Sequence, residues 1–266
     1  MDKKEIVVEV KNLTKKFNSR KVLNGINLKI FKGEIFVIMG GSGCGKSTLM
    51  RHMIGNIKPN SGKTFLLGKD ITGLYGEDLD SVRKKIGMSF QSSALFDSMN
   101  VAENVSLPLK EHTKLDKSVI DIIVKMKLEL VGLRGFEELM PSELSGGMKK
   151  RVGLARAIAM DPEIVFYDEP TAGLDPIVAS VIGKLIMDLS NKLSITSVVV
   201  THDMKSIMMI ADRVAMLYEG KVLEVGTAKE IKRSKNDMVQ QFIKGEHDGP
   251  IKFFQQKDDY LEKLMS

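Results

Sequence analysis

The chain of 266 residues has a single cysteine and lacks long apolar runs. One cysteine excludes an internal disulfide and a metal site built from several cysteines. Apolar runs such as 35–39 and 198–200 are far too short to cross a bilayer. The opening residues, MDKKEIVVEV, place Glu5 and Glu9 where a signal peptide needs an apolar core, so we interpret them as a strand. We therefore expect a cytosolic protein that acts at a membrane only through a partner.

A block of one charge sign is also missing. The net charge is +6, but the 40 basic residues are spread along the chain among 34 acidic ones. A positive balance admits nucleic acid or an anionic membrane surface as a partner, whereas a mixed distribution is typical of a solvated surface. Hydrophobic residues at 43% are ordinary for a folded chain. We expect one large core, or one core with an inserted subdomain, and no nucleic-acid partner.

Strand and helix patterns alternate along the chain. Short apolar segments typical of strands buried on both faces occur at 34–40, 84–91, 163–169 and 195–202. Helical patterns separate them, at 47–54, 146–159, 177–192 and 203–211. A Met-rich run at 204–217 is also interpreted as helix, with its methionines as core filler. The alternation predicts an α/β fold with a mostly parallel sheet.

Residues able to bind or activate a ligand follow each predicted strand. They are the loop from Gly40 to Ser47, Gln91, the pair Asp168 and Glu169, and His202. Ligands of open α/β sheets bind beyond the carboxyl ends of the strands. The sequence therefore predicts that these residues form one active site.

The segment GGSGCGKS matches the phosphate-binding loop of nucleotide hydrolases. Its glycines allow backbone N–H groups to surround phosphate oxygens, and the following helix adds its positive end. Lys46 is expected to reach the β and γ phosphates of ATP, and the Ser47 hydroxyl to bind Mg²⁺. The predicted ATP-binding residues are Gly40, Gly41, Ser42, Gly43, Cys44, Gly45, Lys46, Ser47 and Thr48.

Cys44 within this loop has two interpretations. It is either an inert small filler, or a thiol whose pKa is lowered by the helix start and by Lys46. The inert interpretation is the preferred one.

The polar residues at the other strand ends are each predicted to have a different chemical role. Asp168 suits Mg²⁺ through water, and Glu169 is predicted as the general base towards an attacking water. His202 is predicted to polarise the γ phosphate or hold that water, and Gln91 to contact both Mg²⁺ and water. Without the glycine loop, the acidic pair would instead be interpreted as a helix cap, and the histidine as a packed residue.

A second glycine-rich helix start occurs in LSGGM, at 144–148. Ser145 is predicted as the N-cap, and Gly146 and Gly147 expose amides that suit an anion. The alternative is a merely flexible helix start, but two glycines are poor helix formers and need another reason to be there.

Together these motifs resemble the ATP-binding cassette (ABC) ATPases, from about residue 5 to 245. GGSGCGKS corresponds to Walker A, Gln91 to the Q-loop, LSGGM to the signature motif, IVFYDE to Walker B, AGLD to the D-loop and His202 to the switch histidine. The resemblance implies that Phe17 stacks on adenine. It also implies an antiparallel N-terminal β-subdomain and an inserted helical subdomain beside the parallel core.

In that family two cassettes dock head to tail. The resemblance therefore implies a homodimer in which Ser145, Gly146, Gly147 and Asp175 contact the ATP held by the partner. It divides the chain into a catalytic core with its β-subdomain (1–91 and 161–245), a helical signature subdomain (92–160) and a C-terminal tail (246–266). Apolar tail residues predicted to dock on the partner cassette are Phe253, Phe254, Tyr260 and Leu264.

The run around the signature is similar to the ATPases of Mla-type phospholipid transporters, in which Met148 replaces the usual glutamine. That similarity implies a permease as partner, reached through apolar residues near 95–101, a lipid-binding envelope protein, and a position on the cytoplasmic face of the inner membrane. The alternatives are an ATPase that imports a small polar solute, and a division-type cassette that moves no cargo.

Overall fold

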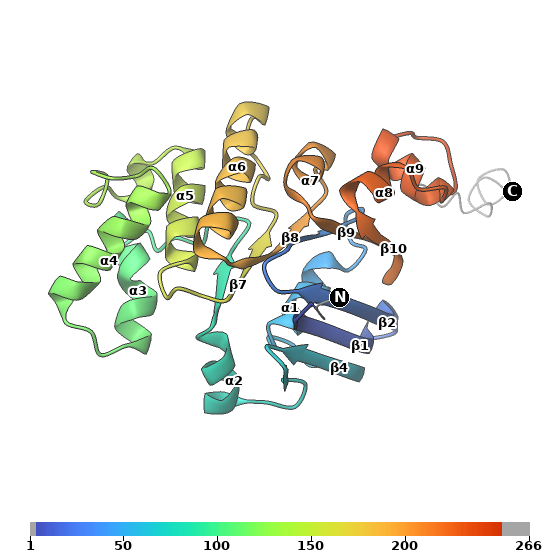
Figure 1. The fold of residues 1–266 in the computed structure, drawn as a ribbon, viewed down its shortest axis with the longest axis horizontal. Helices are drawn as coiled ribbons and strands as arrows, with labels where there is room; N and C mark the ends of the chain where they lie inside the picture. Colours follow the sequence, from blue (N-terminus) through green and yellow to red (C-terminus); the bar gives the residue numbers. More distant parts are fainter. Residues whose placement is uncertain (1–3, 252–266) are drawn as a thin grey trace, which may run out of the picture.

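A six-stranded sheet forms the centre of the molecule, in the order β10-β9-β3-β8-β7-β6. The computed structural model describes residues 4–251 (Figure 1). The strands of this sheet are β3 (Ile35–Met39), β6 (Ile86–Ser89), β7 (Ile164–Asp168), β8 (Thr196–Thr201), β9 (Arg213–Tyr218) and β10 (Lys221–Thr227). All neighbours pair in parallel except β9 and β10, which are antiparallel. The predicted mostly parallel core sheet is confirmed.

A second, antiparallel sheet lies beside the first (Figure 1). Its strands, in the order β2-β1-β4-β5, are β1 (Ile6–Phe17), β2 (Arg20–Phe31), β4 (Ser61–Leu66) and β5 (Lys69–Asp70). The strand expected in the opening segment is present from Ile6 onwards. The expected antiparallel N-terminal sheet is confirmed as well.

The core sheet is buried on both faces, which explains why its strands are continuous apolar runs. Along β3, Ile35, Val37 and Met39 pack with the helices that follow later in the chain. Phe36 and Ile38 point the opposite way, towards α1 (Lys46–Met53), α2 (Gly76–Arg83) and the antiparallel sheet. All five side chains are at most 4% exposed. Two apolar cores thus meet at one sheet and hold its carboxyl edge rigid.

Three helices pack together at the side of the core sheet next to β6 and β7 (Figure 1). They are α3 (Val101–His112), α4 (Lys117–Leu130) and α5 (Gly146–Ala157), with a 3₁₀ turn at Pro141–Glu143 before α5. A capping box of Asn100 and Glu103 starts α3. Ser145 caps α5 as predicted, since its hydroxyl accepts the Met148 N–H at 3.3 Å. These helices fall within the segment 92–160 assigned to the helical subdomain.

The last third of the chain contains α6 (Pro176–Leu193), α7 (Met204–Ile210), α8 (Ala228–Lys232) and α9 (Asp237–Lys244). The prediction of one Met-rich helix over 204–217 is wrong, because the helix ends at Ile210 and Arg213–Tyr218 is strand β9. Residues 214–217 are all buried and lie between β3 and β10. A short apolar run is compatible with the periodicity of a helix or of a strand, and here the pairing with β3 makes it a strand.

The described part of the C-terminal tail folds back on its own chain. The Gln241 side chain accepts the Ile251 N–H at 2.7 Å and donates to the Ile251 carbonyl at 3.1 Å. The four apolar residues on which the docking prediction rests lie outside the described residues. Within residues 4–251, no helix is both long and apolar enough to span a membrane.

Candidate functional site

The phosphate-binding loop turns sharply between β3 and α1 because its glycines adopt conformations closed to other residues. Gly40, Gly43 and Gly45 have φ angles of 151°, 74° and 109°. A Cβ on Gly40 would lie 2.1 Å from the Leu217 carbonyl oxygen, and one on Gly45 would lie 2.9 Å from a Leu23 methyl carbon. The loop therefore requires glycine at these two positions for space as well as for conformation.

Lys46 begins α1 and is only 7% exposed. Its ammonium donates to the carbonyls of Gly40 at 2.8 Å and Gly41 at 3.0 Å, and lies 3.9 Å from a Glu169 carboxylate oxygen. A buried cation beside exposed loop amides makes this end of the sheet a site for an anion.

Cys44 is buried in the same loop. Burial raises the pKa of its thiol, and this effect outweighs the nearby Lys46 ammonium, which lowers it. The hypothesis of a reactive, low-pKa thiol is therefore wrong. The interpretation of Cys44 as an inert filler agrees with its burial.

Ser47, at the start of α1, and Asp168, at the end of β7, bring two oxygens together. The Ser47 hydroxyl donates to Asp168 Oδ1 at 3.2 Å. Burial raises the pKa of Asp168, although the Ser47 hydrogen bond lowers it. No cluster of three or more His, Cys, Asp or Glu among residues 4–251 can hold a metal by itself. A hydroxyl and a carboxylate suit Mg²⁺, which takes its other ligands from phosphate and water.

Glu169 and His202 form a pair at the ends of β7 and β8. His202 Nδ1 lies 3.0 Å from Glu169 Oε1 and 2.9 Å from Oε2. Glu169 is 9% exposed and has a φ of +46°, a left-handed conformation that costs about 1–2 kcal/mol for a residue with a Cβ. Its N–H donates to the Val200 carbonyl at 2.8 Å, which fixes it against β8.

The alternative interpretation of the acidic pair as a helix cap is wrong. The helix that follows, α6, is capped by Asp175, whose carboxylate accepts the N–H groups of Ile177 and Val178 at 3.0 Å each. Asp168 and Glu169 are therefore available to the site.

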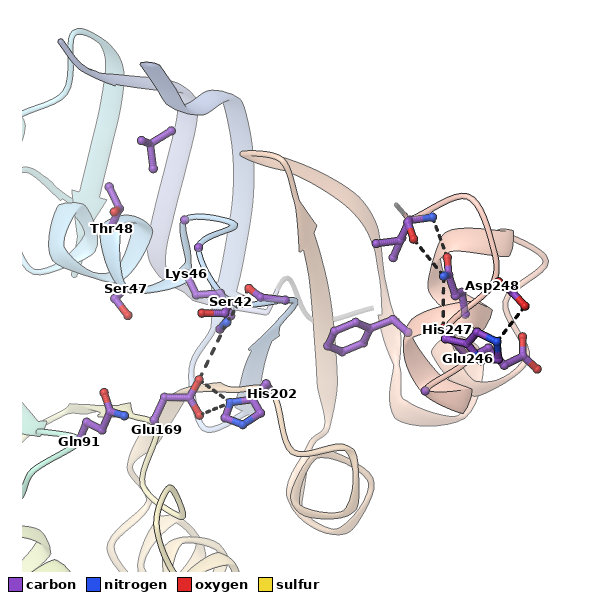
Figure 2. A pocket seen from close by; sticks show the side chains of 18 residues that line it. Ser42, Lys46, Ser47, Thr48, Gln91, Glu169, His202, Glu246, His247 and Asp248 are labelled. Atoms are coloured by element: carbon purple, nitrogen blue, oxygen red, sulfur yellow. Dashed lines mark hydrogen bonds and ion pairs between the residues drawn. The ribbon is translucent and has the colours of Figure 1, made fainter. Parts of the chain in front are cut away.

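Most of these residues line one open pocket of about 1240 Å³, whereas Gly40, Cys44 and Asp168 are not part of its lining. Figure 2 shows Gln91 and Glu169 side by side, with Lys46 above Glu169 and the His202 ring against its carboxylate. Of the predicted ATP and catalytic residues, the pocket lining includes Gly41, Ser42, Gly43, Gly45, Lys46, Ser47, Thr48, Gln91, Glu169 and His202. The four predicted strand ends thus meet in one place. The opposite wall, from Gln241 to Ile251 around the end of α9, was not predicted.

Several predicted site residues lie elsewhere. Ser145, Gly146, Gly147 and Asp175 do not line this pocket, and neither does Phe17. Phe17 is 47% exposed, with the Lys15 ammonium 5.2 Å from its ring centroid. The signature end of α5 instead packs on the start of α6, where a Cβ on Gly147 would lie 2.7 Å from a Val178 methyl carbon. One chain alone does not bring the signature to its own phosphate loop.

Sequence reasoning missed Lys150. This lysine of α5 is 7% exposed and donates to the carbonyls of Gln91 and Glu169. Burial lowers the pKa of its ammonium, while the charges of Glu169 and Asp168 raise it. A signal was available, because Lys150 lies on the same helical face as Gly153 and Leu154, which are buried.

The model of the ABC transporter family matches residues 23–172. The chain is 46% identical to the intermembrane phospholipid transport system ATP-binding protein MlaF of Haemophilus influenzae, over 97% of this chain and 98% of that protein. It is 40% identical to the probable ribonucleotide transport ATP-binding protein mkl of Mycobacterium leprae, over 96% of this chain and 73% of that protein.

A solved structure shares the fold. It is the post-hydrolysis dimer of the ATP-binding cassette MJ0796 with ADP and Pi, with a TM-score of 0.76 and 32% identity over 83% of this chain and 98% of that one. The chain therefore belongs to the ABC transporter family and is one of its ATP-hydrolysing cassettes.

Proposed function

We propose that this chain is the ATPase subunit of a phospholipid transporter. The observation that carries the cargo assignment is the 46% identity to a phospholipid-transport MlaF protein along nearly the full length of both chains. The pocket geometry supports the chemistry, since the phosphate loop, Glu169 and His202 line one cavity and Asp168 accepts a hydrogen bond from Ser47 of that lining. ATP is the substrate, and Mg²⁺ is the metal that the site requires.

Each residue has a role in this proposal. The loop amides and Lys46 hold the β and γ phosphates, while Ser47, Asp168 and Gln91 hold Mg²⁺, which neutralises phosphate charge when bound. A Glu169 carboxylate oxygen accepts a proton from the attacking water. His202 donates its Nδ1–H to Glu169, which orients that carboxylate and leaves Nε2 to accept a hydrogen bond from the attacking water. Phe17 stacks on adenine.

The active unit in this proposal is a head-to-tail homodimer. Ser145 and the amides of Gly146 and Gly147 form an anion-binding helix end that does not line the pocket of its own chain. A second copy supplies the missing ligand, because its ATP is closed by this helix end and by Asp175. Closure on ATP and reopening after hydrolysis drive the attached permease.

The partners follow from the same proposal. A permease of the cytoplasmic membrane receives the motion at the helical subdomain (92–160), and a lipid-binding envelope protein receives or delivers the lipid. The cassette is then peripheral, on the cytoplasmic face of the inner membrane. The similarity to a probable ribonucleotide transport protein favours a second candidate, in which the same ATPase serves a transporter of a polar solute.

The first test uses Glu169→Gln, expressed in the native host. We expect this variant to bind ATP, to stop hydrolysis and to accumulate as a closed dimer, because only the proton acceptor is removed. The complex is recovered from gently solubilised membranes, and its proteins and lipids are identified by mass spectrometry. Wild type recovered in the same way is the control.

The outcomes separate the candidates. A permease with a lipid-binding envelope protein and bound phospholipid supports the proposal. A soluble solute-binding protein, or division proteins without lipid, overturns the cargo assignment and leaves the ATPase in place. Hydrolysis by Glu169→Gln at the wild-type rate overturns the role of Glu169.

A further inference from the structure

A buried ammonium crosses the boundary between the helical subdomain and the catalytic core. Lys150 is in the first turns of α5, yet its two acceptors are the carbonyl of Gln91, after β6, and the carbonyl of Glu169, after β7. The longer of the two contacts, to Glu169, is 3.4 Å. Burying a lysine is costly unless its charge is satisfied. Here it is satisfied by two backbone oxygens and by the negative charges of Glu169 and Asp168.

Both acceptors belong to segments with unfavourable backbone conformations. Glu169 has a φ of +46°, and Ser93 and Ala94, just after Gln91, have φ angles of 62° and 46°. Residues with a Cβ adopt such angles only when surrounding contacts impose them. A helix donor that binds these carbonyls supplies such a contact.

A second residue of α5 holds the same segment. Arg156, two turns beyond Lys150, donates to the Ser93 carbonyl at 2.7 Å and the Ala94 carbonyl at 2.8 Å. Two side chains of α5 therefore hold the chain from Gln91 to Ala94 at two places. Of the two cations, only Lys150 also reaches Glu169.

We propose that Lys150 is a positioning residue for ATP hydrolysis, which holds Glu169 and the Gln91 segment in register with α5 by donating to one backbone carbonyl of each. Because α5 begins at Ser145 and Gly146, the helix end proposed to grip the partner's ATP is rigidly tied to the general base of its own chain. This inference rests on the proposed role of Glu169 as base.

The test replaces Lys150 with methionine, which keeps the length and apolar stem but removes the donors. We expect kcat for ATP hydrolysis to fall by about 10- to 100-fold, as for a misplaced catalytic group. The KM for ATP should stay within about 3-fold, because the phosphate loop is untouched. Lys150→Arg retains charge and donors, and should restore kcat to within about 3-fold of wild type.

A matched control is available in the same subdomain. Lys127 of α4 is 6% exposed, and its ammonium bonds Asp161, away from the pocket. Lys127→Met removes an equally buried ammonium, so we expect it to lower the melting temperature while kcat stays within about 2-fold of wild type. If Lys150→Met and Lys127→Met lower kcat equally, or if Lys150→Met leaves kcat unchanged, the positioning role is wrong.

A double variant separates this inference from the assignment of Glu169. When Glu169→Gln has removed the base, adding Lys150→Met should change residual hydrolysis by less than about 2-fold, since the two residues act as one unit. Independent, multiplying losses overturn the inference even if Glu169 is the base. Full hydrolysis by Glu169→Gln alone overturns the base assignment and this inference with it, whereas full hydrolysis by Lys150→Met alone overturns only the inference.

Discussion

At the residue scale, a buried histidine lies in the last turn of the helix that follows the phosphate loop. His52, on α1, is 1% exposed, and its Nδ1 lies 2.8 Å from the Thr48 carbonyl, so the neutral ring carries its proton on Nδ1. Among the described residues, its Nε2 is a buried nitrogen without a partner. Burial lowers the pKa of His52 from 6.5, and the charge of Lys15 lowers it further. Burial in the folded protein therefore favours the neutral form of His52.

This predicts a loss of stability on mild acidification. Because the pKa of His52 is lower in the folded state, the unfolded chain takes up the proton at a higher pH than the folded protein does. The free energy of unfolding is therefore unaffected by His52 above pH 6.5 and falls as the pH drops from 6.5 towards the pKa of the folded state. One titrating group changes the free energy of unfolding by at most about 1.4 kcal/mol per pH unit. Urea unfolding at pH 7.5 and 5.5 should show a smaller loss for His52→Gln than for wild type. Equal losses would show that other groups dominate.

At the scale of elements, α6 shows how one residue serves structure and function together. Asp175 is the N-cap of α6 through two hydrogen bonds and is also the residue proposed to meet the partner's ATP. The two roles are separable, because asparagine caps a helix about as well as aspartate.

We predict that Asp175→Ala lowers the free energy of unfolding by about 1 kcal/mol, while Asp175→Asn leaves it unchanged. Urea denaturation checks both values. A fall in ATPase rate for the asparagine variant, without a fall in stability, then measures the role towards the partner. An asparagine variant as unstable as the alanine one would contradict the capping account.

At the scale of the whole molecule, the two ends of the described chain behave differently. The N-terminal strand is built into the antiparallel sheet, whereas 246–251 are held chiefly by Gln241 of α9. The dimer-docking role of the tail remains a proposal, since its apolar residues lie beyond Ile251.

Two truncations test it. Ending the chain after Ile251 should leave the unfolding free energy unchanged but weaken the ATP-driven dimer of Glu169→Gln, measured by sedimentation. Ending it after Lys244 removes Ile251 as well and should also destabilise the monomer, because the Gln241 amide loses its partners. A dimer that is equally strong after the first truncation would contradict docking by the tail.

The site motifs and most of the fold can be predicted from the order of the residues alone. The loop from Gly40 to Ser47 can be predicted because phosphate binding requires glycine, lysine and a hydroxyl at fixed spacing. The other site residues, Asp168, Glu169 and His202, can be predicted because parallel strands share one carboxyl edge, where ligands bind. Buried parallel strands such as β3 are likewise visible as continuous apolar runs.

Features that depend on distant neighbours are visible only in the folded chain. The local pattern of β9 predicts a helix, but pairing with β3 makes this segment a strand. The raised pKa of Cys44 comes from burial, which spacing does not reveal. The sequence alone predicts an exposed helix lysine at position 150. In the folded chain, α5 packs so that Lys150 donates to the carbonyls of Gln91 and Glu169. Local motifs can be recognised from the order of the residues, whereas burial and long-range contacts arise only when the chain packs.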